Sequence, residues 1–325
     1  MKTKQVIVPN YGSIDVLKME EKDISNPGIN QVMIQNKYIS VDYTDIYWRT
    51  GQLDAPQPPL IPGKAGAGVV AKLGPNVTKF NPGDRVAYIQ APGAYAEYFN
   101  APAKMVVKLP DNISFREAAS MMMKGLTADA LIKHVYSVNH DKTIFIHAMA
   151  GGVGSFLTAW GKLLGATVIG SVGSDSKVEY AKRLGADKVI NYHQEDITKT
   201  VNSYTGHKGV DVVYDGIGKA TVDVSLEILK ALGLYVNFGQ VSGPITDFAL
   251  GRLAAKTQYA TFANVNTFVD DLGMLQQMSN ELFKFYVSSN FKVNQEITEF
   301  SFDDVKEAQK LLESGKSQGS IVMKV

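Results

Sequence analysis

The stretch HAMAGGVG, residues His147–Gly154, decides the fold. It follows an apolar run of strand length and opens an expected helix, which is the context that a dinucleotide-binding fingerprint requires. Small residues let the backbone approach a pyrophosphate, and the start of the helix supplies free N–H groups and a positive dipole end. The spacing is A-x-x-G-x-x-G, with Ala148, Gly151 and Gly154, because Met149 stands at the first glycine position. An ordinary glycine-rich turn between a strand and a helix is the alternative.

Strand-like and helix-like segments alternate through the middle of the chain, which favours the dinucleotide-binding interpretation. Such alternation predicts an α/β fold with a doubly wound parallel sheet of the Rossmann type, joined by right-handed crossovers. The expected strands are Thr143–Met149, Thr167–Val172, Lys188–Tyr192, Val210–Ile217 and Leu234–Gly239, and the expected helices are Gly152–Leu164, Ser176–Leu184, one that ends near Tyr204, and Ala220–Leu229.

The two ends of the chain have a different texture. The first ~120 residues are rich in short strands and turns, and residues 114–134 then show helical spacing. A β-containing tail after such an array is expected to pack back on the N-terminal β-domain. The expected N-terminal strands are Gln5–Val8, Gln31–Ile39 and Ala65–Leu73, and the tail is expected to hold a helical stretch Phe268–Val287 ended by Ser288, Ser289 and Asn290, a strand Val293–Phe300, a helix Phe302–Glu313 and a strand Ser320–Val325.

Composition excludes several classes of function. The 325 residues include 33 Lys and Arg against 32 Asp and Glu, a net charge of +1 that gives no electrostatic footprint for nucleic acid. The absence of cysteine excludes disulfides, thiolate zinc sites, iron–sulfur clusters and a catalytic thiol. The five histidines include no pair with H-E-x-x-H spacing, and His147 is expected to be a buried, hydrogen-bonded residue, so we expect no metal site. No signal peptide or membrane helix is expected, which predicts a cytoplasmic protein.

The residues after the second expected strand favour NADPH over NADH. Gly173 and Ser174 stand where an NAD-binding fold places the acid that holds the ribose 2′-OH. Lys177 and Tyr192 add an ammonium and a phenol, so three polar groups can surround a 2′-phosphate. Asp175 is a counter-signal, one residue late for the NAD role.

At this point the chain resembles a known family, the zinc-independent quinone oxidoreductases (zeta-crystallin-like proteins) of the medium-chain dehydrogenase/reductase superfamily. The resemblance covers essentially the whole chain. It rests on VDYTDIYWRTG (Val41–Gly51), GDRV (Gly83–Val86), KGLTA (Lys124–Ala128), HAMAGGVG, VGS with Lys177, INY (Ile190–Tyr192), VVYDGIG (Val212–Gly218), NFGQVSG (Asn237–Gly243) and SQGS (Ser317–Ser320).

The resemblance implies a GroES-like β-domain (residues 1–122 and 267–325), a Rossmann NADPH-binding domain (residues 123–266) and a cleft between them. It also implies NADPH-dependent reduction of quinones in that cleft and, commonly, a homodimer. By position it assigns the pyrophosphate to Gly151, Gly152 and Val153, the 2′-phosphate to Ser174, Lys177 and Tyr192, the ribose and nicotinamide to Ile217, Phe238, Gly239 and Ser242, and the nicotinamide end of the cleft to Tyr47, Lys124 and Thr127.

A quinone accepts a hydride, and the developing oxyanion then needs a proton or a hydrogen bond. Tyr47 is the candidate donor, and Asp45 and Arg49 are candidates for orienting its loop or meeting a carbonyl. The alternatives are core packing for Tyr47 and its neighbour Trp48, and a helical surface ion pair for Asp45 and Arg49, which are four residues apart.

The chain departs from the family pattern at several positions. Asp42, within the expected cofactor-binding set, stands where the family usually has Asn, and its carboxylate would alter substrate preference or demand a partner. The other departures are Ala65 for an acidic residue, Ala159 for a glutamine, and Phe262 and Gly315 for two arginines. Two further hypotheses therefore stay open: an NADPH-dependent reductase of enones or 2-alkenals, and a non-catalytic NADPH-binding protein with a structural or RNA-associated role.

Overall fold

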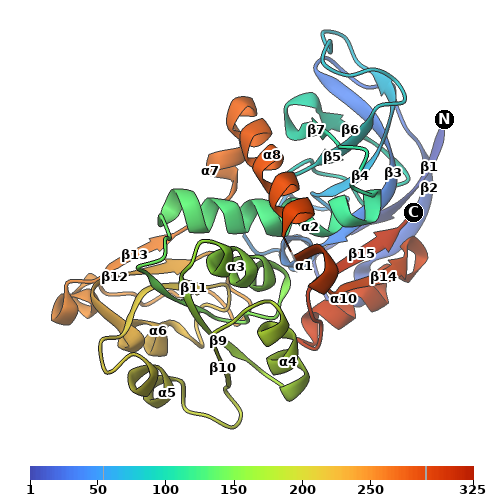
Figure 1. Cartoon of the computed structure of the whole chain (residues 1–325). Helices are drawn as coiled ribbons and strands as arrows, with labels where there is room; N and C mark the ends of the chain where they lie inside the picture. Colours follow the sequence, from blue (N-terminus) through green and yellow to red (C-terminus); the bar gives the residue numbers. More distant parts are fainter. Residues whose placement is uncertain (54, 290) are drawn as a thin grey trace. The chain divides into compact units, whose positions relative to one another are not determined.

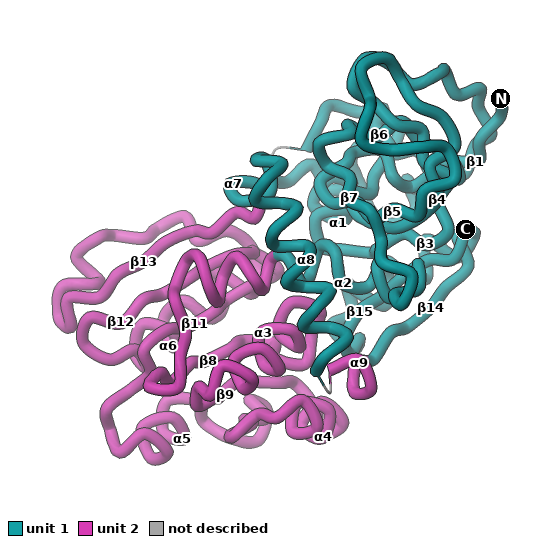
Figure 2. Tube along the Cα trace, turned by 45° about the horizontal axis from the view of Figure 1, so that its top comes forward, with its two compact units in different colours: residues 1–126, 266–289, 296–325 teal, residues 127–265, 290–295 magenta. Residues whose placement is uncertain are grey.

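A computed structural model describes residues 1–53, 55–289 and 291–325. The chain forms two compact units, shown in teal and magenta in Figure 2. Unit 1 contains residues 1–126, 266–289 and 296–325, and unit 2 contains residues 127–265 and 290–295. Each unit therefore has its own sheet and its own core.

Unit 2 is built on a six-stranded sheet in which every neighbouring pair of strands is parallel (Figure 1). The strands lie in the order β10-β9-β8-β11-β12-β13, which is the 3-2-1-4-5-6 order of a Rossmann fold. The predicted fold class is confirmed. The strands are β8 (Thr143–Ile146), β9 (Thr167–Val172), β10 (Lys188–Asn191), β11 (Val210–Asp215), β12 (Leu229–Asn237) and β13 (Tyr259–Phe262).

Helices connect these strands and cover the sheet. All six residues of β11 are buried, as expected for a central parallel strand with both faces covered. Phe145, Ile169 and Val213 from neighbouring strands join one apolar cluster with helix residues such as Leu226. The helices between the strands are α3 (Gly152–Leu163), α4 (Asp175–Arg183), α5 (Ile197–Tyr204) and α6 (Val222–Ile228), and α9 (Phe291–Asn294) also belongs to this unit.

Unit 1 is mainly β-structure. Its larger sheet has the order β14-β15-β3-β4-β5-β7, with β6 paired to β3, and every pair except β14·β15 is antiparallel. β15 pairs with β3, so the end of the chain completes a sheet of N-terminal strands. The strands are β1 (Lys2–Ile7) and β2 (Lys18–Asp23), which form a separate antiparallel pair, with β3 (Gln31–Val41), β4 (Gly66–Leu73), β5 (Arg85–Tyr88), β6 (Tyr98–Pro102), β7 (Val106–Lys108), β14 (Ile297–Ser301) and β15 (Ser320–Lys324).

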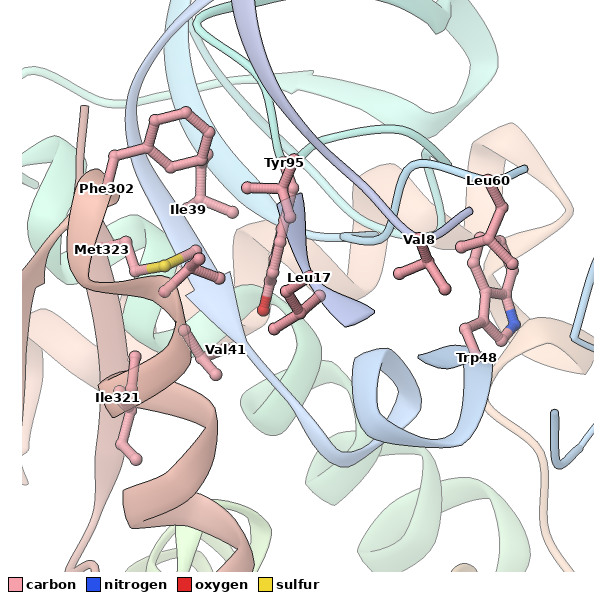
Figure 3. Packing of buried hydrophobic residues seen from close by; sticks show 13 residues of the cluster. Val8, Leu17, Ile39, Val41, Trp48, Leu60, Tyr95, Phe302, Ile321 and Met323 are labelled. Atoms are coloured by element: carbon pink, nitrogen blue, oxygen red, sulfur yellow. The ribbon is translucent and has the colours of Figure 1, made fainter. Parts of the chain in front are cut away.

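Residues from both ends of the chain form one core of unit 1 (Figure 3). Ile39 and Val41 come from β3, and Ile321 and Met323 come from its partner β15. Trp48 joins the same cluster from α1. Packing against the sheet therefore fixes the helix that carries all three predicted catalytic residues. The helices of unit 1 are α1 (Tyr43–Thr50), α2 (Phe115–Asp129), whose last three residues belong to unit 2, α7 (Asn266–Val269), α8 (Leu272–Ser288) and α10 (Val305–Glu313).

Side-chain caps set the start of two of these helices. Ser114 and Glu117 form a reciprocal cap at α2, in which the Ser114 N–H donates to Glu117 Oε2 and the Glu117 N–H donates to Ser114 Oγ. Asp271 caps α8 by accepting from the Met274 N–H. This cap breaks the predicted helical stretch 268–287 into α7 and α8. The predicted end of that stretch includes Asn290, which lies outside the described residues.

The predicted strand 293–300 is wrong in its first half. Residues Phe291–Asn294 form the short helix α9, and β14 begins only at Ile297. The helical spacing over residues 114–134 is confirmed for α2, but the chain continues as a π-helix over Ala130–Val135. β2 and β13 were not expected, since one is rich in charge and the other is short and exposed.

Candidate functional site

The glycine turn of unit 2 has the geometry of an anion-binding helix start. α3 begins directly after Gly151, whose backbone is extended and whose N–H donates to the Ala148 carbonyl at 2.8 Å. Ala148 has φ +48°, the left-handed conformation that glycine usually provides in such turns. A side chain at Gly154 would collide with the Ala148 carbonyl oxygen, so this position requires glycine. Because the first N–H groups of a helix lack partners within it, the turn fits a pyrophosphate.

The residues predicted for a 2′-phosphate lie around the start of α4. Ser174 precedes the helix and Lys177 lies on its first turn. A Cβ at Gly173 would come within 2.5 Å of the Tyr192 hydroxyl, so this phenol lies directly over the glycine. Burial lowers the pKa of Lys177 below its ordinary 10.5, and a bound anion would offset that cost. The cluster therefore fits a phosphate group.

Asp175, the residue that argued for NAD and against NADPH, forms hydrogen bonds with other side chains. Its Oδ1 accepts from Asn191 Nδ2 at 2.8 Å and from Gln194 Nε2 at 3.1 Å. The carboxylate therefore joins the start of α4 to the loop after β10.

The third predicted group of unit 2 consists of residues from two neighbouring loops. Ser242 donates to the Ile217 carbonyl from both its backbone N–H and its hydroxyl, each at 2.9 Å. A Cβ at Gly216 would come within 2.9 Å of the Phe238 ring, and one at Gly239 within 2.7 Å of the Gly216 carbonyl oxygen. The structure thus brings Ile217, Phe238, Gly239 and Ser242 together.

Sequence analysis missed the carboxylate that organises these loops. Asp215, at the end of β11, is fully buried, and its Oδ1 accepts from the Ile217 N–H at 2.7 Å. Its Oδ2 accepts from the Tyr235 hydroxyl at 2.8 Å and from the Thr221 hydroxyl at 2.8 Å. The signal for it was an acid that directly follows the apolar residues Val212–Tyr214.

His147 is buried and hydrogen-bonded, as predicted. Its Nδ1 lies 3.2 Å from Ser171 Oγ and its Nε2 lies 2.9 Å from Ser225 Oγ. Burial lowers its pKa below the ordinary 6.5, because the charged ring would lose its hydration.

In unit 1, Asp42 and Lys124 form a buried ion pair. Lys124 Nζ lies 2.6 Å from Asp42 Oδ1, and both side chains are less than a tenth exposed. The same ammonium donates to Ser40 Oγ at 2.7 Å and to the Val41 carbonyl at 3.3 Å. Asp42 therefore has a partner, and that partner is another residue of the predicted cofactor-binding set. Thr127 lies three residues further along α2.

Asp45 holds the start of α1 in place. Its Oδ2 accepts from the Asp42 N–H at 2.9 Å and from the Tyr95 hydroxyl at 3.0 Å. Its Oδ1 accepts from the Gly63 N–H at 3.1 Å. Burial, together with the nearby Asp42 carboxylate, raises the pKa of Asp45 to about 7.

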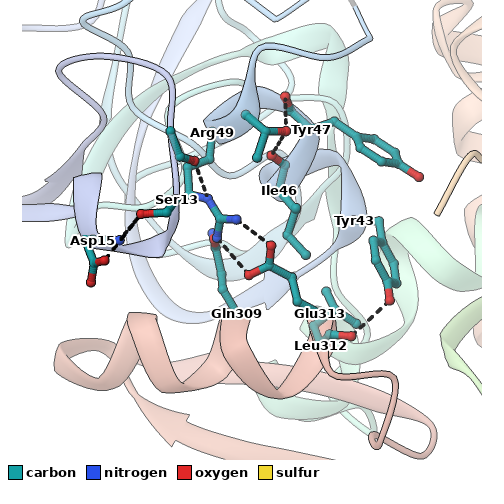
Figure 4. A network of polar contacts seen from close by, with 11 residues as sticks. Ser13, Asp15, Tyr43, Ile46, Tyr47, Arg49, Gln309, Leu312 and Glu313 are labelled. Atoms are coloured by element: carbon teal, nitrogen blue, oxygen red, sulfur yellow. Dashed lines mark hydrogen bonds and ion pairs between the residues drawn. The ribbon is translucent and has the colours of Figure 1, made fainter. Parts of the chain in front are cut away.

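Arg49 is buried and contacts the C-terminal helix α10 (Figure 4). Its Nη1 donates to Gln309 Oε1 at 2.6 Å and to Glu313 Oε2 at 3.1 Å, and its Nη2 pairs with Glu313 Oε1. The alternative of a surface ion pair between Asp45 and Arg49 is wrong, because both side chains are buried. Both residues have contacts that position α1.

Tyr47 is 6% exposed, and its ring centroid lies 6.2 Å from that of Tyr43. The Tyr43 hydroxyl donates to the Leu312 carbonyl at 2.9 Å, and burial raises the pKa of Tyr43 to about 12. Trp48 packs in the core, with Lys64 Nζ 4.2 Å from its ring centroid. Packing therefore accounts for Trp48, and Tyr47 remains the candidate donor.

The other departures from the family pattern have varied surroundings. Ala65 is fully buried just before β4, Phe262 is 53% exposed on β13, and Gly315 has φ +66° in the turn after α10.

Over residues 1–53, 55–289 and 291–325, no group of three or more His, Cys, Asp or Glu side chains is arranged to hold a metal ion. In the same residues no helix is long and apolar enough to cross a membrane.

Two family models match this chain. Residues 28–111 match the alcohol dehydrogenase GroES-like domain, and residues 152–279 match the zinc-binding dehydrogenase family.

Individual relatives match from 73% to nearly all of the chain. A quinone oxidoreductase of Salmonella typhimurium is 40% identical over 316 residues, 96% of this chain and 97% of that protein. The crystal structure of Escherichia coli quinone oxidoreductase complexed with NADPH has a TM-score of 0.94 at 35% identity, covering 99% of this chain and 100% of that one. A 2-haloacrylate reductase from a Burkholderia species is 38% identical over 243 residues, 73% of each chain.

Proposed function

Because the chain belongs to the quinone oxidoreductase family, we propose that it reduces quinones with NADPH, by hydride transfer that uses no metal ion. The observation that carries the proposal is the pair of candidate anion-binding sites in unit 2. The turn Gly151–Gly154 fits a pyrophosphate, and the cluster of Ser174, Lys177 and Tyr192 fits a 2′-phosphate.

In this proposal the residues of unit 2 bind and orient the cofactor. Gly151 would shape the turn, since its N–H donates to the Ala148 carbonyl, and the N–H groups of Gly152 and Val153 would face the pyrophosphate. The Lys177 ammonium would give preference to the phosphorylated ribose. Asp215 fixes the loops of Ile217, Phe238, Gly239 and Ser242, which would pass along the ribose and nicotinamide.

The residues of unit 1 serve the acceptor. The cofactor supplies a hydride when bound. Tyr47 would donate a hydrogen bond to the quinone oxygen, and the Asp45 and Arg49 contacts keep its helix in position. The contacts of Arg49 favour the orienting role over contact with a substrate carbonyl, because Gln309 and Glu313 occupy both terminal nitrogens.

A second candidate function is reduction of an activated carbon–carbon double bond. The similarity to a 2-haloacrylate reductase favours it, since such acceptors take a hydride at carbon instead of oxygen. Both reactions need the same bound cofactor and differ only in the acceptor.

We also propose functional domains with the bounds expected from the sequence, residues 1–122 with 267–325 and residues 123–266. A homodimer and a cytoplasmic location belong to the same proposal. The exposed edge strand β13 supports the dimer, as argued in the Discussion.

The test is NADPH oxidation with a panel of quinones and a panel of 2-alkenals, in wild type and in Lys177→Ala. We expect turnover with quinones that survives a chelator. We also expect Lys177→Ala to weaken NADPH binding by ~10- to 100-fold, which corresponds to the ~1.5–3 kcal/mol of a hydrogen bond to a charged group, and to leave NADH binding unchanged.

Two results would contradict the proposal. Tight NADPH binding without turnover of either panel would leave only a non-catalytic role. Equal losses for NADPH and NADH in Lys177→Ala would remove the 2′-phosphate assignment.

A further inference from the structure

The Lys124 ammonium has no donor left for a ligand. A lysine ammonium carries three N–H donors, and here three acceptors lie within reach: Asp42 Oδ1 at 2.6 Å, Ser40 Oγ at 2.7 Å and the Val41 carbonyl at 3.3 Å. All three acceptors belong to consecutive residues, the last two of β3 and the residue that precedes α1. A ligand that used Lys124 as a donor would have to displace one of them.

The ion pair also cancels the charge of Lys124. Both side chains are nearly excluded from water. In the protein interior the attraction between opposite charges is stronger than at the surface. With Asp42 in contact, the pair presents a dipole instead of a free positive charge. Two other charged groups lie nearby: the Asp45 carboxylate, which accepts from the Asp42 N–H at 2.9 Å, and Lys64, whose Nζ lies 4.2 Å from the centroid of the Trp48 ring. Neither restores a free cation beside the pair.

We propose that Asp42 determines acceptor specificity: by neutralising Lys124 it makes the protein select uncharged quinones and enones and discriminate against acceptors that carry a carboxylate or a sulfonate. The proposal rests on the proposed function, with Lys124 at the nicotinamide, the position that the resemblance assigns to it. An unpaired buried ammonium would instead attract an anionic acceptor, so the residue at position 42 sets the sign of the preference. In the reaction the acceptor takes a hydride from the cofactor and a proton from water.

The test compares two acceptors that differ by one charge, 1,4-naphthoquinone and 1,4-naphthoquinone-2-sulfonate, in wild type and in Asp42→Asn. The amide keeps an oxygen acceptor for Lys124 and removes the negative charge, so the fold is retained. We expect the ratio of kcat/KM for the sulfonated over the neutral quinone to rise by about tenfold in Asp42→Asn, which corresponds to ~1.4 kcal/mol. The comparison of ratios cancels the different intrinsic reactivity of the two quinones.

The matched control is Asp111→Asn, which removes the same charge from a fully exposed position of unit 1, where Asp111 pairs with Arg85. It is expected to leave the ratio unchanged. An equal change for both quinones in Asp42→Asn, or the same shift in Asp111→Asn, would overturn the proposal.

A second measurement does not depend on turnover. Calorimetric titration of the cofactor-free protein with the sulfonated quinone is expected to show about tenfold tighter binding in Asp42→Asn than in wild type. Equal affinities in the two proteins overturn the charge argument. If wild type does not turn over the neutral quinone, the proposed function is overturned instead. Failure of the charge argument and failure of the proposed function are therefore distinguishable.

Discussion

Two opposing effects act on the charge of the buried Asp45 carboxylate. Three donors, the N–H groups of Asp42 and Gly63 and the Tyr95 hydroxyl, stabilise the ionised form. Burial and the neighbouring Asp42 carboxylate oppose ionisation and prevail, so the pKa rises from 3.8 to about 7. The folded protein therefore holds this proton more tightly than the unfolded chain, and the stability that the proton gives is lost as the pH rises from about 4 through 7.

Asp45→Asn is expected to remove this pH dependence. The free energy of unfolding of wild type relative to the variant should fall by roughly 4 kcal/mol between pH 4 and 7, the equivalent of about three pKa units. Urea unfolding of both proteins at half-unit pH intervals measures the difference. Parallel stability curves across that interval would show that Asp45 ionises in the folded protein with an ordinary pKa.

Individual candidate residues stood out in the sequence, but the residues that they contact did not. Arg49 and Asp45 stood out by their spacing of four, which suggested a pair with each other. The structure instead pairs Arg49 with residues 260 and 264 positions away, and Asp42 with Lys124 82 positions away. Local periodicity carries information about one turn of helix, whereas contacts of this range depend on the packing of whole elements.

Helix α1 is held at both ends by different parts of unit 1. At its start Asp45 binds the Gly63 backbone, and near its end Arg49 binds Gln309 and Glu313 of α10. Tyr43 adds a hydrogen bond to the Leu312 carbonyl. The C-terminal helix therefore fixes the element that carries Tyr47 and follows Asp42.

Arg49→Met is expected to loosen this attachment. Glu313 would lose its buried partner and Gln309 Oε1 would lose its donor, so we expect a loss of ~3 kcal/mol in the free energy of unfolding. The control is Lys104→Met, which breaks the exposed pair with Asp270 and is expected to cost less than ~1 kcal/mol. Urea unfolding at neutral pH compares the two. Equal, small losses would show that Arg49 contributes no more than a surface charge.

At the scale of elements, long amphipathic or buried segments were predictable and short ones were not. The central strands of unit 2 follow from their apolar runs, and β9 (Thr167–Val172) has the predicted bounds. β13 has only four residues, all exposed, and β2 has the sequence KMEEKD, so neither shows a burial pattern. Both are strands because a neighbouring strand supplies hydrogen bonds to them, which a local pattern does not reveal.

For the molecule as a whole, the sheet of unit 2 ends at an edge strand that another strand could pair with. β13 pairs only with β12 among the described residues, which leaves one row of backbone N–H and C=O groups open. Its side chains include Tyr259, 56% exposed, and Phe262, 53% exposed. Proteins usually protect such an edge with charge, proline or a cover, and a two-fold related copy would protect it by pairing β13 with itself.

The homodimer predicted from the sequence is therefore expected to form through β13. Light scattering coupled to gel filtration should give twice the 35.4 kDa mass of the chain for wild type. The double substitution Tyr259→Lys and Phe262→Lys should give the monomer, because side chains alternate between the faces of a strand and two lysines, one from each copy, would then lie on each face of the paired strands. Both side chains are exposed in the single chain. Leu163→Lys, at a residue 60% exposed on α3, is the matched control and should remain dimeric. A monomeric wild type would contradict the dimer, and a dimer that survives the double substitution would place its interface on another face of the protein.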